Sequence, residues 1–459
     1  MHFRHALLAA LLTGGIAACA GPRYATMTDD GYRGIWFTLG QFSEYGDKYS
    51  GGLGTYTANH VPIAVYAPEA DKTFFVYGGA KQGERHLLIM ASYYDHKTGL
   101  VPRPAIVHDK QGVNDPHDNP SLCIDERGYL WVFISGRGRG RPGFIYRGAE
   151  PYSIDRFDFV WEGEITYPQP RWIPGKGFLH MFTQYTRGRE LYWSVSPDGR
   201  HWTEPRKLAG IGGHYQTTHQ IGDRVISAFN MHPDGNVDRR TNLYFLQTDD
   251  MGATWRNVRG EPVDTPLTTP YNNALVRDYW SEERMIYIHD LDLDDQGRPV
   301  ILYTTSAHHQ PGPIGDPRWW TVARWNGHDW QYAEICPANH NYSTGSIYLE
   351  GDLWRVIGPT EPGPQPFSCG GEVAIWTSRD HGQTWTKERD VTVGSPRNHQ
   401  YVRRPINAHP DFYAFWADGD PDAFGESHLY FCNRAGDRVW RLPYDMTEDF
   451  ARPILLNTP

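Results

Sequence analysis

The sequence predicts an all-β protein, a seven-bladed β-propeller built from Asp-box repeats. Two segments, TDDMGATW at 248–255 and SRDHGQTW at 378–385, share the pattern Ser/Thr-x-Asp-x-Gly-x-Thr-Trp. In such a box we expect the aspartate to accept hydrogen bonds from turn N–H groups and the glycine to adopt a positive φ. The tryptophan is expected to pack between neighbouring sheets. Eight residues that recur in one order are typical of propeller blades.

Degenerate copies of the box extend the series along the chain. SPDGRHW at 196–202, IDERGYLWVF at 124–133 and LDDQGRPVILY at 293–303 keep the aspartate and the glycine. NRAGDRVWRLPY at 433–444 predicts a further outer hairpin. The markers suggest a unit of about 50 to 60 residues, so about seven blades fit into the chain.

The N-terminal segment is expected to be a signal rather than part of the fold. Arg4 and His5 precede the apolar run 6–12, and Ile-Ala-Ala-Cys at 16–19 resembles a bacterial lipobox. We therefore expect a lipoprotein signal peptide at 1–18, an N-terminal linker at 19–33 and a propeller catalytic domain at 34–459. The protein is expected to reach the bacterial periplasm or outer membrane with a lipid anchor on Cys19, its only membrane contact. An ordinary secretory signal is the alternative.

Composition agrees with an exported, turn-rich β protein. Of 459 residues, 48 are Gly and 34 Pro, and 17 Trp, 28 Tyr and 19 Phe can pack in cores and stack on sugar rings. The net charge of −10 argues against a nucleic-acid partner. We expect a monomer. Four cysteines follow Cys19 without zinc-site spacing, so either one disulfide or four free thiols would fit.

Polar clusters precede the apolar runs that we expect to form the inner strands. Since the inner strands of a propeller surround one axis, these clusters should converge there. A single His or Asn at a strand end most often satisfies backbone groups, but a whole axis of such residues favours ligand binding. The candidate residues of these clusters are Asn59, His60, His117, Asn119, Tyr167, Gln169, His214, Tyr215, His399, Tyr401, Arg403 and Arg404.

The side-chain types in these clusters favour elimination over hydrolysis. A glycosidase normally needs two facing carboxyl groups, and Asp118 is the only acid in the strongest cluster. β-Elimination from a uronic acid needs cations on the carboxylate, a base at C5 and an acid at the departing oxygen. His, Tyr and Arg suit those roles. Tyr185 is a candidate acid or base, although an aromatic residue within a strand is the more frequent explanation.

Several stretches carry a resemblance to a known family. GTYTANHVPIAVY, DPHDNPSLCIDERGYLWVFISGRGRGRPG and VRRPINAHPDFYAFWADG look like the seven-bladed BNR-type propellers that are L-rhamnose-α-1,4-D-glucuronate lyases. That family was earlier described as rhamnosidase-type glycoside hydrolases, and ulvan lyases are its more distant relatives. The resemblance runs from about residue 34 to the C-terminus.

The resemblance also implies catalytic residues. The essential His of the rhamnosyl-glucuronate enzymes falls on His60, whereas the ulvan lyases use a His that falls on His117. Arg137 stands where the ulvan enzymes carry a second His. We assign Arg137 or Arg141 to the glucuronate carboxylate, and we expect Arg139 to lie in a solvated turn.

The predicted function is an exo-acting lyase that removes terminal rhamnose from the glucuronate caps of arabinogalactan-type glycans. Hydrolysis of the same linkage, an ulvan-type endo lyase and a non-catalytic glycan-binding propeller are the alternatives. The partner is expected to be a plant or algal polysaccharide that contains uronate. No cofactor and no metal ligands are predicted, and a structural ion is left open. HPDGNVDRR at 232–240 fits either an ion cradle or a hairpin tip.

Overall fold

The computed structural model describes residues 27–54, 59–81, 84, 86–113 and 115–456. The predicted signal peptide 1–18 and Cys19 lie outside these residues. The helices of the described part are three short 3-10 turns, η1 (Pro116–Asp118), η2 (Pro233–Gly235) and η3 (Pro313–Gly315). None of them has the length and apolar composition needed to span a membrane.

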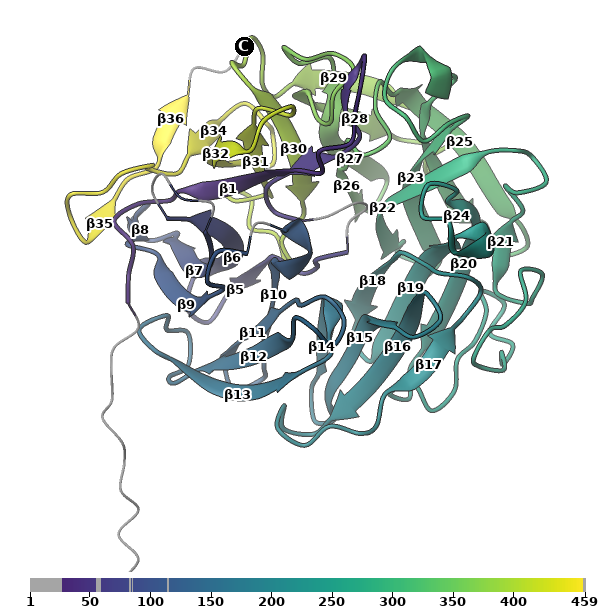
Figure 1. Ribbon diagram of the computed structural model, residues 1–459, viewed down its shortest axis with the longest axis horizontal. Helices are drawn as coiled ribbons and strands as arrows, with labels where there is room; N and C mark the ends of the chain where they lie inside the picture. The colour runs from purple at the N-terminus through teal and green to yellow at the C-terminus, as the bar shows by residue number, and fades with distance from the viewer. Residues whose placement is uncertain (1–26, 55–58, 82–83, 85, 114, 457–459) are drawn as a thin grey trace, which may run out of the picture.

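Six antiparallel sheets of four or five strands follow one another around a common centre (Figure 1). In each sheet the strands pair in chain order, as blades of a propeller do. The six sheets are β10 (Pro120–Ile124), β11 (Leu130–Ile134), β12 (Gly143–Gly148) and β13 (Phe157–Gly163); β14 (Thr166–Ile173), β15 (Gly177–Tyr185), β16 (Arg189–Ser196) and β17 (Arg206–Ala209); β18 (Gln216–Ile221), β19 (Arg224–Met231), β20 (Thr241–Thr248) and β21 (Leu275–Arg277); β22 (Met285–Leu293), β23 (Pro299–Ser306), β24 (Trp319–Trp325) and β25 (Trp330–Pro337); β26 (Ser346–Glu350), β27 (Leu353–Glu361), β28 (Glu372–Ser378) and β29 (Thr386–Asp390); and β30 (Asn398–Arg403), β31 (Ala414–Gly419), β33 (Leu429–Cys432), β34 (Val439–Arg441) and β36 (Ile454–Leu456).

The first sheet is larger and composite. It contains β1 (Gly34–Thr38), β4 (Ser50–Gly51), β5 (Ala64–Ala67), β6 (Lys72–Ala80), β7 (Leu87–Asp95), β9 (Ala105–Asp109) and β32 (Gly425–Ser427). Two small sheets pair β2 (Phe42–Ser43) with β3 (Gly46–Asp47), and β8 (Val101–Pro102) with β35 (Phe450–Ala451). The all-β propeller is confirmed. The prediction of a seven-bladed propeller is corrected to six regular blades among the described residues, because segments from both ends of the chain build the composite sheet, which is called the first blade below.

Segments from the two ends of the chain close the ring. β1 pairs with β32 on one side and meets β6 at Gly34 and Gly79 on the other, and Figure 1 shows purple β1 beside the yellow C-terminal strands. Ile406, which follows β30, accepts from the amide of Tyr66 and donates to the carbonyl of Ala64, both at 2.9 Å. The first and last blades are therefore joined by backbone hydrogen bonds.

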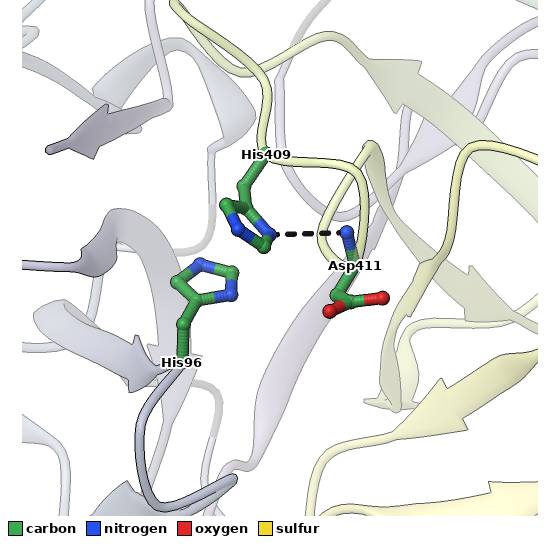
Figure 2. Close-up of side chains that lie close together, drawn as sticks. All are labelled: His96, His409 and Asp411. Atoms are coloured by element: carbon green, nitrogen blue, oxygen red, sulfur yellow. Dashed lines mark hydrogen bonds between the residues drawn. The ribbon is translucent and has the colours of Figure 1, made fainter.

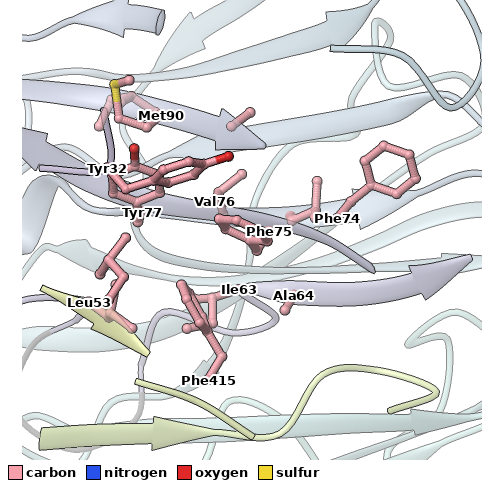
Figure 3. Close-up of a cluster of buried hydrophobic side chains, with 14 of the residues drawn as sticks. Tyr32, Leu53, Ile63, Ala64, Phe74, Phe75, Val76, Tyr77, Met90 and Phe415 are labelled. Carbon is pink, nitrogen blue, oxygen red and sulfur yellow. The ribbon is translucent and has the colours of Figure 1, made fainter. Parts of the chain in front are cut away.

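A hydrophobic cluster fills the space between the first and last blades (Figure 3). The Phe75 ring on β6 lies 5.0 Å from Phe415 on β31 and 5.8 Å from Phe412, measured between centroids. All three side chains are fully buried. Burial of a Phe side chain contributes about 1.5–3 kcal/mol, so this core supports the same closure as the strand pairing.

The Asp boxes have the predicted local structure. Asp250 accepts from the amide of Thr254 at 2.9 Å and from the Thr248 hydroxyl at 2.8 Å, and Gly252 has a φ of 77°. Trp255 is buried against Trp193 of the preceding blade, with 5.5 Å between ring centroids. This box therefore ties its blade to the preceding one.

The four cysteines of the described residues are buried free thiols, the second of the two expected alternatives. They are Cys123, Cys336, Cys369 and Cys432.

Removal of an Asp-box carboxylate should destabilise the propeller. Asp380 accepts from the amides of Gln383 at 3.0 Å and Thr384 at 2.9 Å. Asp380→Ala leaves those turn amides without their acceptor, so we expect a loss of about 1–2 kcal/mol in the free energy of unfolding, measured with urea. Asp264→Ala, at an exposed position, is the control and should change it by less than about 0.5 kcal/mol. Equal effects of the two substitutions would contradict this role of the box.

Candidate active site

The candidate site lies where the inner strands begin. His60 precedes β5, His117 lies in η1 just before β10, and Tyr167 is the second residue of β14. Because inner strands of a propeller run in the same direction along the axis, their first residues meet at one end of it. The structure brings these three rings together: the Tyr167 centroid lies 5.4 Å from that of His117 and 5.6 Å from that of His60.

Asp115 holds the His117 ring in one orientation. The Asp115 carboxylate caps η1 by accepting from the His117 amide at 3.0 Å, and it also accepts from Nδ1 of the same ring. Its second oxygen accepts hydrogen bonds from the Arg137 and Arg141 guanidinium groups, each at 2.7 Å. Burial raises the pKa of this carboxyl, but the hydrogen bonds from His117 and Arg141 lower it by more, to well below its usual range. Asp115 is therefore a permanent anion.

His117 is held in its neutral form. Burial lowers its pKa below 6.5, and the charges of Arg137 and Arg189 lower it further, although Asp115 opposes them. With Nδ1 donating to Asp115, the lone pair of the neutral ring is on Nε2. A neutral imidazole of fixed tautomer is suited to act as a general base.

Tyr185 and Arg189 complete the cluster from the β15–β16 hairpin. The two residues face each other in the strand register, and the Arg189 guanidinium carbon lies 5.5 Å from the centroid of the Tyr185 ring. Burial raises the pKa of the Tyr185 hydroxyl, although Arg189 and Arg137 act to lower it. The hydroxyl thus keeps its proton at neutral pH and can donate it.

His60 lies behind His117 rather than beside the charged groups. Its side chain is fully buried, and Nε2 lies 3.1 Å from the backbone carbonyl oxygen of His117. The Tyr401 hydroxyl lies 3.2 Å from the His60 amide. Burial lowers the pKa of His60 to about 3. This geometry makes His60 a support for the His117 backbone.

The predicted amide side chains connect neighbouring inner strands. Gln169 donates to the carbonyl oxygens of Asn59 at 3.1 Å and Gln216 at 2.9 Å. Asn119 donates to the carbonyl oxygen of Gly52 at 2.8 Å. These residues lie at the predicted end of the axis, where they fix the backbone beneath the cluster.

The two remaining predicted histidines have both ring nitrogens engaged. His214 Nδ1 donates to the Asn230 carbonyl oxygen at 2.7 Å, and its Nε2 accepts from the Ile211 amide at 2.9 Å. His399 lies 3.1 Å from Trp416 Nε1 and 2.8 Å from the Ser395 hydroxyl. Both histidines therefore satisfy local groups, which is the ordinary structural explanation for a buried His.

The predicted arginines separate into two groups. Arg403 ends β30 and donates to the His289 carbonyl oxygen at 2.9 Å, and Arg404 pairs with Asp292 and Asp290. They lie at the end of the inner strand, away from its beginning, and the Arg403 guanidinium carbon lies 4.9 Å from the centroid of the Tyr401 ring. Arg141 forms ion pairs with Asp115 and Asp118 and is 30% exposed, whereas Arg137 forms an ion pair with Asp115 and is 41% exposed. Arg139, at 92%, lies in a solvated turn as expected.

Sequence reasoning missed Arg189, and it considered His232 and Arg240 only as the two ends of segment 232–240, an ion cradle or a hairpin tip. Tyr215, a predicted residue, lies 5.7 Å from Tyr167 and 4.8 Å from His232, centroid to centroid, and the Arg240 guanidinium carbon lies 4.5 Å above its ring. One available signal was the pair Tyr185 and Arg189 flanking a hairpin turn. Another was the recurrence of Tyr near the start of successive inner strands, at 167, 215, 287, 342 and 401.

The sequence matches the BNR repeat-containing family over residues 85–337. The Ulvan Lyase-PL25 of Pseudoalteromonas sp. (strain PLSV) is 22% identical over 403 residues, which cover 76% of each chain. An ulvan lyase of Nonlabens ulvanivorans is 22% identical over 347 residues, 65% of this chain and 69% of that one.

Solved structures share the fold. A polysaccharide lyase PL25 ulvan lyase bound to -[GlcA(1-4)Rha3S]- superposes with a TM-score of 0.69 and 18% identity, covering 83% of this chain and 94% of that chain. The polysaccharide lyase Uly1 gives 0.60 and 14%, covering 90% and 99%. Because the family match spans more than half of the chain, this protein belongs to the BNR repeat-containing family.

Proposed function

We propose that the protein is a polysaccharide lyase that breaks the bond between rhamnose and O4 of glucuronate by β-elimination. The observation that carries the proposal is one cluster of a neutral His117, a protonated Tyr185 and the cations Arg137 and Arg189. Those groups match a base, an acid and a carboxylate partner. The names of the similar proteins support the same reaction class.

The arginines bind the uronate carboxylate. Arg189 lies over Tyr185, and the exposed part of Arg137 is accessible to a ligand. Guanidinium groups bind carboxylates through two parallel hydrogen bonds, and their charge stabilises the enolate-like anion that forms when C5 loses its proton. Their positive charge therefore makes the C5 proton more acidic.

His117 and Tyr185 then move the protons. Nε2 of His117 takes the C5 proton, the electron pair of that bond forms the C4–C5 double bond, and the C4–O4 bond breaks. The Tyr185 hydroxyl gives its proton to the departing O4, so the products are a hydroxyl on the leaving rhamnose and an unsaturated uronate. Proton transfer from His117 to Tyr185 through solvent restores both residues.

Hydrolysis of the same linkage fits the structure less well. A glycosidase needs one carboxyl group that is protonated and one that is accessible. Asp115 is held anionic by His117 and Arg141, and Asp118 is buried with ion pairs to Lys110 at 2.6 Å and Arg141 at 2.7 Å. Both oxygens of Asp115 are engaged, by His117 and by the two arginines, and the Asp118 side chain is fully buried.

Two polysaccharides that contain this bond are candidate substrates. We propose terminal rhamnose on arabinogalactan-type caps as the first, since Arg137 replaces the second His of ulvan enzymes in the sequence resemblance. An ulvan-type internal bond is the second, favoured by the similar ulvan lyases and by the position of His117 rather than His60 at the centre of the cluster.

One assay distinguishes these functions. Protein is incubated separately with rhamnose-capped arabinogalactan and with ulvan, while free rhamnose and the ultraviolet absorbance of a conjugated uronate are recorded. We expect both signals from arabinogalactan. Absorbance from ulvan without free rhamnose would support the second candidate. Rhamnose without absorbance would indicate a hydrolase, and no signal from either polymer would favour a binding propeller; both outcomes contradict the proposal.

Substitutions separate the proposed base from its support. His117→Ala and Tyr185→Phe should each lower kcat by about 10²–10⁴-fold, because each removes a proton-transfer group. His60→Ala should lower kcat less, because His60 acts through the His117 backbone. His328→Ala, at an exposed site, is the control. Circular dichroism and urea unfolding check the fold of each variant. A larger loss for His60→Ala than for His117→Ala would move the base to His60.

The pH profile follows from the two pKa shifts. The pKa of His117 lies below 6.5, so the acidic decline of kcat/KM should begin below pH 6.5. Because the pKa of Tyr185 is raised, kcat/KM should stay unchanged to above pH 9. Asp115→Asn removes the charge that stabilises the protonated ring. The acidic decline should therefore shift to lower pH while kcat falls, because the ring loses its orienting anion. A shift to higher pH would refute this role of Asp115.

A further inference from the structure

A second group of polar side chains lies where the first and last blades meet, away from the candidate active site (Figure 2). His96 follows β7, whose last residue Asp95 pairs with Lys72 at the start of β6. His409 and Asp411 lie in the loop between β30 and β31. Inner strands β5 and β30 run from the active-site end toward these loops. The group therefore occupies the opposite end of the propeller.

Side-chain atoms of the three residues lie within reach of one ion. One donor atom from each of His96, His409 and Asp411 lies within 4.8 Å of the other two. The two imidazole rings are only 3.7 Å apart, centroid to centroid. Among residues 27–54, 59–81, 84, 86–113 and 115–456, no other three His, Cys, Asp or Glu side chains are grouped in this way.

The His96 ring is oriented as a metal ligand would be. Its Nε2 lies 2.8 Å from the Thr73 hydroxyl, and its Nδ1 is buried without a hydrogen-bond partner. Metal-bound histidines characteristically use one nitrogen for the ion and donate from the other to an oxygen of the protein. A buried imidazole nitrogen without a partner is costly unless a ligand occupies it. This nitrogen is the second, independent sign of a site.

The other two side chains can supply ligands with small movements. His409 Nδ1 accepts a hydrogen bond from the Asp411 amide at 3.1 Å. A neutral imidazole has only one nitrogen that can accept, so binding of the ion through either nitrogen replaces this hydrogen bond. One Asp411 carboxylate oxygen lies 3.3 Å from Arg438. Ligands on a tetrahedral Zn²⁺ lie about 3.4 Å apart, so the group must contract by roughly 1 Å.

We propose that His96, His409 and Asp411 bind a divalent transition-metal ion, with Zn²⁺ as the best fit, that clamps the first blade to the last. Two imidazole nitrogens and one carboxylate oxygen suit Zn²⁺, whereas Ca²⁺ and Mg²⁺ prefer oxygen ligands alone. Water fills the fourth position. The clamp stabilises the ring and takes no part in the chemistry at His117, so it does not rest on the proposed function.

Metal titration tests the clamp directly. Protein without a histidine tag is treated with chelator, dialysed and titrated with ZnCl₂ by calorimetry and with CoCl₂ by visible absorbance. We expect one ion per chain and the absorption of tetrahedral Co²⁺. Saturating Zn²⁺ should raise Tm by about 2–5 °C, because it binds only the folded chain. Absence of binding by the native protein would overturn the proposal.

Variants locate the ion. His96→Gln, His409→Gln and Asp411→Asn should each weaken binding at least tenfold and abolish the Zn²⁺-dependent rise in Tm, whereas His328→Gln, at an exposed control position, should keep both. Unchanged binding in all three variants would place the ion elsewhere and refute the assignment. Where a variant fails to fold, the Co²⁺ spectrum and stoichiometry of the native protein still decide whether such a site exists.

Discussion

Closure of the ring is the constraint on which the rest of the structure depends. Inner strands surround one axis only if the first and last blades are held together, and here β1 bridges them by pairing with β32 and meeting β6. The Ile406 backbone and the aromatic contact of Phe75 with Phe415 reinforce the same junction. A lost contact at this place would disturb every blade, since each blade is positioned by its neighbours.

Electrostatics at the active-site end are arranged around Asp115. This one carboxylate orients His117 and holds Arg137 and Arg141, so a single anion determines both the tautomer of the base and the place of two cations. Arg189 lies on another hairpin and is not paired with Asp115. A uronate carboxylate arriving at the cluster therefore meets two cations, one of which is already partly neutralised.

Local signals made much of the fold predictable from sequence. The Asp boxes specify a turn and a packed Trp within eight residues, and Trp255 is buried against Trp193 as such a motif implies. The composite first sheet was not predictable, because pairing of β1 with β32 joins residues almost 400 positions apart and leaves no local pattern. Of the candidate site, His117 and Tyr167 were found from their place before inner strands. His214 looked equivalent in sequence, yet local carbonyl and amide groups occupy its ring. Arg189 was missed because only the hairpin register brings it opposite Tyr185.

The most direct test of the account is a crystal structure of the Tyr185→Phe variant with a bound oligosaccharide that contains rhamnose linked to O4 of glucuronate. The account predicts that the glucuronate carboxylate lies within hydrogen-bond distance of Arg189 or Arg137 and that C5 faces Nε2 of His117. A sugar bound with its carboxylate away from both arginines, or at the end of the axis near Arg403 and Arg404, would contradict it.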